Sequence, residues 1–217
     1  YTHEVMFIMK YPFNQVASIR GTALFRNDRS VFLSTDLSNL NEQDIVKPWA
    51  GLKVEFTYDD TRTLGLNLYE GLRYKLFAEA YNQIDRKKAD LFVLGADFRH
   101  YLKIHRTFIW ANRFATSTSF GHTPLIYYLG SLDNWTNLSP RVQTFDRSVP
   151  IDYSRNYAFQ TLATNMRGFT QNIRNGNNFA LANSELRFPV FRYFFNRPIS
   201  SALLNNFQVV GFFDVGT

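Results

Sequence analysis

The sequence predicts an all-β fold of about eight antiparallel strands, and three observations lead to that prediction. Apolar and polar residues alternate with a period of two through most of the 217 residues. Apolar repeats with a helical period are nearly absent. The polar connectors between the alternating segments are short and long in turn, which places turns at one end of a sheet and loops at the other.

Each expected strand is defined by its own alternation. The segment 51–59, for example, sets Leu52 and Val54 against Lys53 and Glu55. The alternating segments are, in chain order, 4–11, 16–26, 51–59, 71–81, 90–104, 107–117, 183–191 and 206–215.

The connectors predict one domain with a large insertion. Short connectors are expected at 14–15, 62–70 and 104–106, and longer irregular ones at 27–50, 82–90 and about 119–180. The last is far beyond the usual length of a loop, which favours a functional role for it. We therefore expect residues 1–217 to form one partial barrel domain with a loop insertion at about 119–180.

Alternation alone leaves two architectures open. The apolar face can point into a water-soluble core, as in a sandwich or a lipocalin-type barrel, or outward into lipid around a polar lumen. Strands of about 9–11 residues, long enough to cross a bilayer at a tilt, favour the second. So does a polar face that carries charges of both signs in strand after strand, comprising Lys53, Glu55, Arg73, Lys75, Glu79, Asp97, Arg99, Arg113, Glu185, Arg187 and Asp214.

Aromatic residues near the strand ends also favour a transmembrane barrel, because such barrels carry aromatic girdles at both interfaces. The aromatic residues expected there are Tyr11, Phe13, Trp49, Tyr58, Tyr81 and Tyr101. A sheet that spans lipid must close, since an open edge leaves backbone groups unsatisfied. Eight strands could close a small barrel, but the alternation is already under way at both ends of the chain, so further strands and any flanking domain are expected outside it.

Composition argues against several functions. The net charge of +6 permits an acidic partner, but the basic residues are spread along the strands, so nucleic-acid binding is not predicted. The chain has no cysteine, its four histidines lack metal-ligand spacing, and no nucleophile, P-loop or dinucleotide motif occurs. We therefore expect no enzyme activity, no metal and no cofactor. No apolar run is long enough for a transmembrane helix.

Three motifs occur in a fixed order. Arg167-Gly168-Phe169 lies in the long connector, SELRFP at 184–189 opens a strand, and FFDVG at 212–216 lies in the last strand. PLIYYLGSLDNW (124–135) precedes the first motif. It resembles a known sequence motif that usually has a second glycine where Ser131 stands. YDDTR and GLNLYEG, within 58–71, are similar to a periplasmic turn pattern but lack its proline.

In this order of motifs the chain resembles the C-terminal barrel of the BamA and two-partner-secretion transporter superfamily, the bacterial surface-antigen type. The segment 156–179 is most similar to a branch in which the barrel follows a TolB-like β-propeller. The resemblance covers nearly the whole chain. It implies a sixteen-stranded antiparallel barrel in the bacterial outer membrane, of which this chain holds roughly strands six to thirteen, with a long extracellular loop folded into the lumen.

The resemblance also implies roles for six residues. Arg167 is expected to reach into the lumen and to pair with the carboxylates of Glu185 and Asp214. A guanidinium binds carboxylates through two parallel hydrogen bonds, which a lysine does not reproduce. Gly168 is expected to let the chain turn at the loop tip, and Phe169 to pack against the wall. Gly216 completes the motif of the last strand. Without the resemblance, Arg167 would be interpreted as a solvated arginine of a surface loop.

The function implied is the insertion, assembly or translocation of proteins at the outer membrane. The alternative is a passive barrel anchor, or an accessory subunit of a larger complex that carries a periplasmic propeller. A diffusion porin fits less well, because an inward loop would obstruct its lumen. The expected partners are outer-membrane lipids and lipopolysaccharide, client or partner outer-membrane proteins, and periplasmic or lipoprotein subunits.

Overall fold

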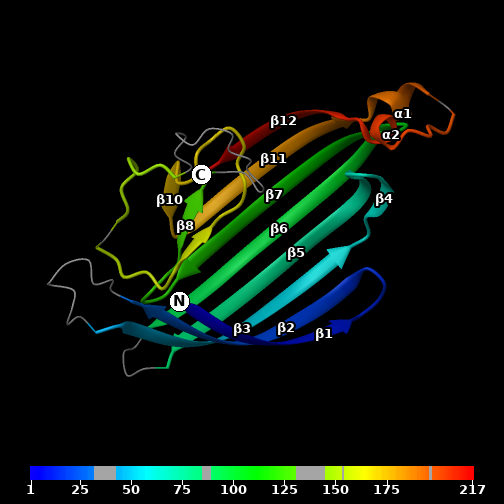
Figure 1. Cartoon of the computed structure of the whole chain (residues 1–217). Coiled ribbons are helices and arrows are strands. Elements are labelled where there is room, and N and C mark those ends of the chain that lie inside the picture. The colour runs from blue at the N-terminus through cyan, green and yellow to red at the C-terminus, as the bar shows by residue number, and fades with distance from the viewer. Residues whose placement is uncertain (32–42, 85–88, 131–144, 153, 196) are drawn as a thin grey trace.

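One large antiparallel sheet forms most of the fold, as Figure 1 shows. The structure is a computed structural model that describes residues 1–31, 43–84, 89–130, 145–152, 154–195 and 197–217. The main strands pair in chain order: β1 (Thr2–Pro12), β2 (Ala17–Ser30), β3 (Ile45–Asp59), β5 (Leu68–Gln83), β6 (Asp90–His105), β7 (Phe108–Phe120), β11 (Asn178–Phe188) and β12 (Val209–Gly216). The predicted all-β, antiparallel fold is confirmed.

The remaining elements lie at the two ends of this sheet. The short strand β4 (Arg62–Gly65) pairs only with β5. Between β7 and β11, β8 (Ile126–Leu129), β9 (Gln160–Leu162) and β10 (Arg174–Gly176) form a separate three-stranded sheet. Between β11 and β12 lie two short helices, α1 (Val190–Phe194) and α2 (Ala202–Asn206). None of the helices that the structure describes has the length and hydropathy needed to cross a membrane.

Several strands are longer than expected. The strands β2, β3, β5, β6 and β7 have 14, 15, 16, 16 and 13 residues, where about 9–11 were predicted. The expected irregular connector at 27–50 was wrong at both ends, because β2 continues to Ser30 and β3 begins at Ile45. Antiparallel pairing continues through these polar residues, as in the register of Asn27 with Pro48. Ladder hydrogen bonds form whatever the side chain, so loss of apolar alternation does not end a strand.

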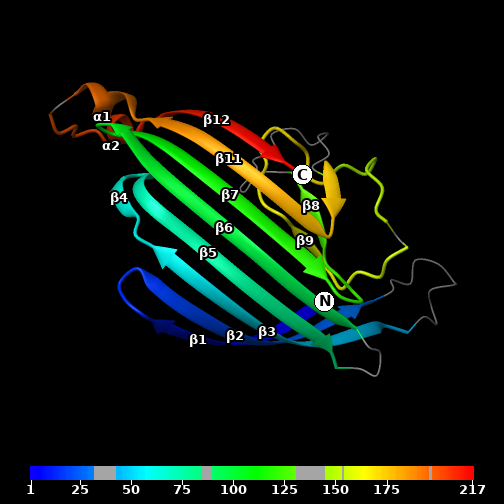
Figure 2. The same ribbon diagram turned by 180° about the vertical axis from the view of Figure 1, so that it is seen from behind.

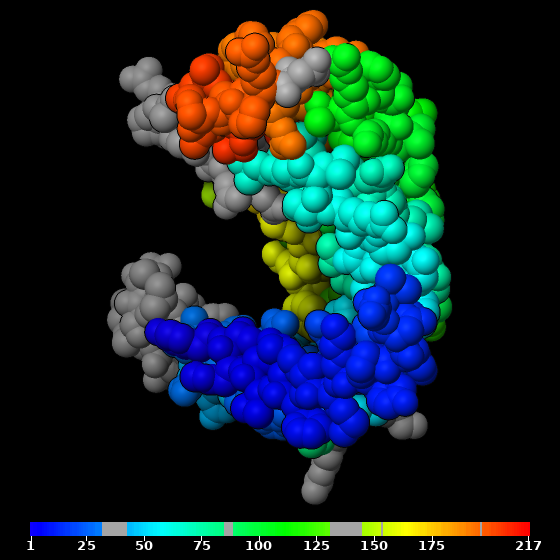
Figure 3. Space-filling model, turned by 90° about the vertical axis from the view of Figure 1, so that its right-hand side faces the viewer, coloured from blue at the N-terminus to red at the C-terminus, as the bar shows by residue number. Residues whose placement is uncertain are grey.

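The sheet curls into an open trough with β1 and β12 as its edges, as Figure 3 shows. The concave face carries the predicted charges in ion pairs. Lys53 Nζ lies 2.8 Å from Glu79 Oε1, and Arg113 Nη2 lies 2.6 Å from Asp97 Oδ2. The convex face is apolar and exposed, with large side chains that include Phe7, Leu52, Val54, Leu76, Leu94, Phe98, Phe114, Leu186 and Phe213.

Aromatic residues form a band on the convex face near the turn end of the strands. Ring contacts with centroids 5.2–6.4 Å apart link Tyr11, Phe13, Phe56, Tyr58, Tyr74 and Phe98. The girdle prediction was wrong for three residues: the side chains of Trp49, Tyr81 and Tyr101 alternate with the convex residues and face inward. Trp49 is only 1% exposed, because it packs in an interior cluster with Tyr81.

The described part of the segment between β7 and β11 lies at the end of the sheet opposite α1 and α2, as Figure 2 shows, and Figure 3 shows some of it inside the trough. Leu125 and Tyr127 from this segment are buried against Trp49, Leu91 and Val93 of the sheet. The Tyr127 hydroxyl also lies 2.9 Å from Ser117 Oγ of β7. Burial of several large side chains at this contact fixes the segment on the sheet, since each contributes about 1.5–3 kcal/mol.

Candidate functional site

The candidate site begins with the backbone around Arg167. Met166 is buried against Leu129 of β8 and Leu181 of β11, so the residue before Arg167 is held on the sheet by apolar packing. Gly168, the residue after it, has a φ of 86°, which an L side chain rarely adopts. The chain therefore turns directly after Arg167, as predicted, and the arginine side chain points toward the sheet.

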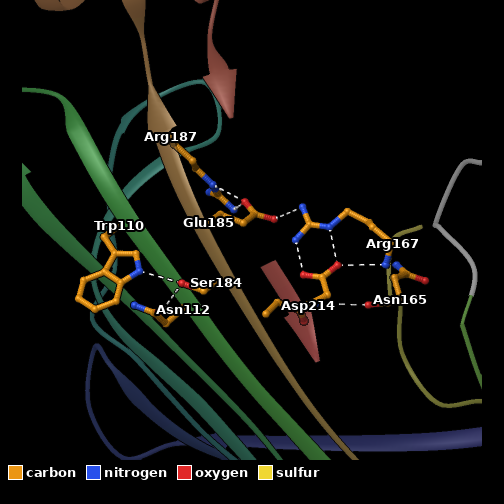
Figure 4. Close-up of polar contacts among 9 residues, drawn as sticks. Trp110, Asn112, Asn165, Arg167, Ser184, Glu185, Arg187 and Asp214 are labelled. Atoms are coloured by element: carbon orange, nitrogen blue, oxygen red, sulfur yellow. Dashed lines mark hydrogen bonds and ion pairs between the residues drawn. The ribbon is translucent and has the colours of Figure 1, made fainter. Parts of the chain in front are cut away.

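Arg167 binds both predicted carboxylates, as Figure 4 shows. Its Nε and Nη2 donate to the two oxygens of Asp214 at 2.8 and 2.7 Å, and its Nη1 donates to Glu185 Oε1 at 2.5 Å. The backbone N–H of Arg167 also donates to Asp214 Oδ2, at 3.0 Å. The Asp214 side chain is only 2% exposed and that of Arg167 21%, so water screens this ion pair weakly.

The two carboxylates are brought together by the register of the last two strands. Asp214 of β12 lies opposite Asn183 of β11, and Glu185 lies opposite Phe212. Side chains two residues apart on a strand share a face, so both acids project from the concave side toward the loop tip. The hydrogen bonds with Asp214 raise the pKa of the Arg167 guanidinium further above its ordinary value, and it stays charged at any physiological pH.

Phe212 is the part of the site that the motif reasoning missed. Arg167 Cζ lies 4.1 Å from the centroid of the Phe212 ring, which is a cation–π contact. Phe169, in contrast, does not take the predicted place against the wall and remains 42% exposed. Phe212 stands two residues before Asp214, so the strand period carried a signal for its inward position.

Gly216 lies where the chain before Arg167 packs on the sheet. A Cβ at this position would approach Leu181 Cδ1 to 2.8 Å and both Leu129 Cδ2 and Met166 Sδ to 3.2 Å. The absence of a side chain at Gly216 therefore lets the residue before Arg167 reach the sheet.

We expect Gly216→Val to weaken loop docking by about 1–3 kcal/mol, because the added methyl groups must displace Met166 and Leu129. Gly211→Val is the matched control in the same strand, since a Cβ there meets nothing within 4 Å. Hydrogen exchange of the backbone around Arg167 checks this. Equal exchange in the two variants would contradict the packing role of Gly216.

A second element enters the concave face from the turn end. The hairpin β4–β5 buries Leu68 completely against Ile109 and Ala111 of β7. The sequence predicted only a tight connector at 62–70. Its inward fold was missed because a single buried leucine in so short a segment gives no periodic signal.

Three side chains that follow β7 in the sequence donate hydrogen bonds to the tip of this hairpin. Arg187 Nη1 donates to the carbonyl of Asn67 at 2.8 Å. Arg192 Nη2 donates to the carbonyl of Leu64 at 3.0 Å, and Gln208 Nε2 to that of Leu66 at 2.6 Å. The segment 187–208 therefore satisfies backbone acceptors of the hairpin that strand pairing leaves free.

Glu185 connects the two inward elements. Its Oε1 accepts from Arg167 of the loop, and its Oε2 accepts from Nε and Nη2 of Arg187 at 2.8 and 2.7 Å. Arg187 in turn contacts Asn67 of the hairpin. A continuous series of charge-assisted contacts thus runs from the loop tip, through one carboxylate, to the hairpin tip at the other end of the trough.

The other residues considered from sequence have simpler surroundings. Arg174 lies in β10, opposite Leu129 of β8, with an exposed side chain. Ser131 and the rest of its motif to residue 135 lie outside the described residues. Across the part of the chain that the structure describes, no group of three or more histidine, aspartate or glutamate side chains could hold a metal ion.

No protein-family model matches this chain, and no curated protein matches it significantly. The case for a function rests on the residues and the geometry described above.

Proposed function

We propose that this chain is part of an outer-membrane β-barrel of the kind that inserts, assembles or translocates proteins across the bacterial outer membrane. The observation that carries the proposal is the contact of Arg167 with Asp214 and Glu185. These three residues come from the motifs on which the resemblance to the BamA and two-partner-secretion superfamily rests. Their association inside the trough supports an inward loop of the kind that the resemblance implies.

The two faces of the sheet are consistent with a membrane location. The convex face exposes Leu52, Val54 and Phe114 by 48–65%, which is costly in water and favourable in lipid. The concave face places both signs of charge around open space, including a cavity of about 270 Å³ beside Arg167. In this proposal the strands span the membrane, the loop segment 121–177 enters the lumen from outside the cell, and the hairpin enters it from the periplasm.

Depletion of the protein from its native cell tests the proposed activity. We expect outer-membrane or secreted proteins to decrease, because their insertion or export would fail. Complementation with wild-type protein should restore them, and complementation with Arg167→Ala should restore them only partly. Unchanged levels of outer-membrane and secreted proteins after depletion would refute an assembly or secretion role. A large steady current in planar bilayers would instead support a porin.

One observation favours the second candidate, an accessory subunit of a larger membrane complex. His100, Asn112 and Ser184 lie side by side in register across β6, β7 and β11 on the convex face. Ser184 Oγ accepts from Trp110 Nε1 at 2.8 Å and donates to Asn112 Oδ1 at 2.9 Å, as Figure 4 shows, whereas His100 lies exposed at the end of this row. Polar side chains facing lipid are costly and suit contact with another protein. A photo-crosslinker at His100, with Phe114 as the control position, tests this. A specific adduct in native membranes at His100 alone would favour the accessory role.

A further inference from the structure

The connection between β11 and β12 exposes an unusual amount of apolar surface. This segment, residues 189–208, contains α1 and α2 and projects beyond the strand ends in Figure 1. Phe194, Phe195 and Leu203 are 64%, 59% and 74% exposed. The segment contains two arginines, Arg192 and Arg197, and no acidic residue. Exposed large apolar side chains on a basic segment suggest a partner that is both apolar and anionic.

The segment is held in one orientation by its polar groups. The Tyr193 hydroxyl lies 3.0 Å from His105 Nδ1, and the Tyr193 carbonyl accepts from Arg106 Nη1 at 3.0 Å. Arg192 donates to the carbonyl of Leu64 in the hairpin. Arg192 and Tyr193 make these contacts, whereas the neighbouring Phe194 and Phe195 side chains remain mostly exposed. Their exposure is therefore built into the fold.

The exposed side chains continue the convex face of the sheet. The ring of Phe188, on the convex side of β11, lies 5.6 Å from that of Phe108 and 5.9 Å from that of Phe194. The aromatic band of the neighbouring strands reaches the same end of the sheet, at Tyr58 and Tyr74. The segment thus extends a surface that, in the proposed function, faces lipid.

We propose that residues 189–208 are an interfacial membrane anchor that lies at the headgroup level of the periplasmic phospholipid leaflet. Phe194, Phe195 and Leu203 insert below the headgroups, and Arg197 binds their phosphates. Aromatic side chains favour this boundary, and each basic residue near an anionic surface adds electrostatic attraction. This inference rests on the proposed membrane location of the sheet. Because the same segment holds the hairpin through Arg192 and Gln208, the leaflet would also support the hairpin at the lumen entrance.

The lack of native cysteine in this chain allows a direct test by site-specific labelling. Single-cysteine variants Phe194→Cys and Leu203→Cys are labelled with a fluorophore and reconstituted into phosphatidylcholine vesicles with and without phosphatidylglycerol. Lipids with a nitroxide near the headgroup or deep in the acyl chain serve as quenchers. We expect both labels to be quenched about twofold more by the shallow nitroxide, since interfacial segments lie near the headgroups. Arg197→Gln should remove the part of the quenching that depends on phosphatidylglycerol.

Two controls separate failure of this inference from failure of the proposed function. Phe114→Cys labels the middle of the convex face and should be quenched by the deep nitroxide. Thr57→Cys labels the concave side at the same end of the sheet and should be quenched by neither lipid. Quenching at Phe114 without quenching at Phe194 and Leu203 would overturn the anchor and leave that surface to a protein partner. Absence of quenching at Phe114 as well would overturn the membrane location itself, and the anchor with it.

Discussion

Replacing Arg167 with Ala should free the loop segment from the trough while the main sheet stays folded. The substitution removes the three side-chain hydrogen bonds to Glu185 and Asp214 and keeps only the one from the backbone N–H. It also leaves the almost fully buried Asp214 carboxylate without its cation. Breaking a buried pair costs about 3–5 kcal/mol; we expect about 2–3 kcal/mol here, because part of the guanidinium is exposed. That loss corresponds to a roughly 30- to 160-fold increase in loop opening.

Hydrogen exchange and limited proteolysis of the loop segment measure this opening. Heat-modifiable migration in gels, which is expected of the proposed barrel, reports whether the main sheet remains folded. Arg174→Ala is a matched control, since it removes an exposed arginine from the same loop. Arg167→Lys tests the geometry: it keeps the charge but cannot form the paired hydrogen bonds with Asp214, so it should behave more like Ala than like the wild type. Unchanged protection of the loop in Arg167→Ala would refute the anchoring role.

The strands and the inward position of Glu185 and Asp214 could be predicted from the sequence because both depend on the same alternation. A period of two assigned Glu185 and Asp214 to one face, and the ladder between β11 and β12 brings those faces together. The role of Arg167 was predicted from the order of the motifs and the resemblance that it carries. Such a resemblance gives information on contacts between distant segments, which local propensity lacks. In the structure all three meet.

The remaining features depend on contacts between distant segments. The inward hairpin is held by Arg187, Arg192 and Gln208, more than a hundred residues away along the chain. Trp49 was assigned to a girdle from its place near a strand end, but its neighbours in space include Leu125 of the loop segment. Trp49 is separated from Lys53 and Glu55 by an even number of residues, so the alternation itself indicated that it faces inward. Alternation was therefore the better guide, and position along the strand was misleading.

Glu185 is the position at which the loop and the hairpin depend on one carboxylate. Its oxygens accept separately from Arg167 and Arg187, so loss of the carboxylate leaves two guanidinium groups close together without their shared anion. We expect Glu185→Ala to loosen the loop tip and the hairpin tip together, because Arg187 also donates to Asn67. Glu185→Gln keeps the shape and loses the charge, so it should weaken both contacts less than Ala does.

A double-mutant cycle between Arg167→Ala and Arg187→Ala measures the connection. With Glu185 present, we expect a coupling free energy of about 0.5–2 kcal/mol, read from hydrogen exchange of residues 62–70. In the Glu185→Gln background the coupling should fall toward zero. Arg113→Ala is the control, because that arginine faces the same cavity but pairs with Asp97. If Arg167→Ala leaves exchange of the hairpin unchanged while Arg187→Ala increases it, the two inward elements open independently, and the contacts through Glu185 do not couple the two ends of the trough.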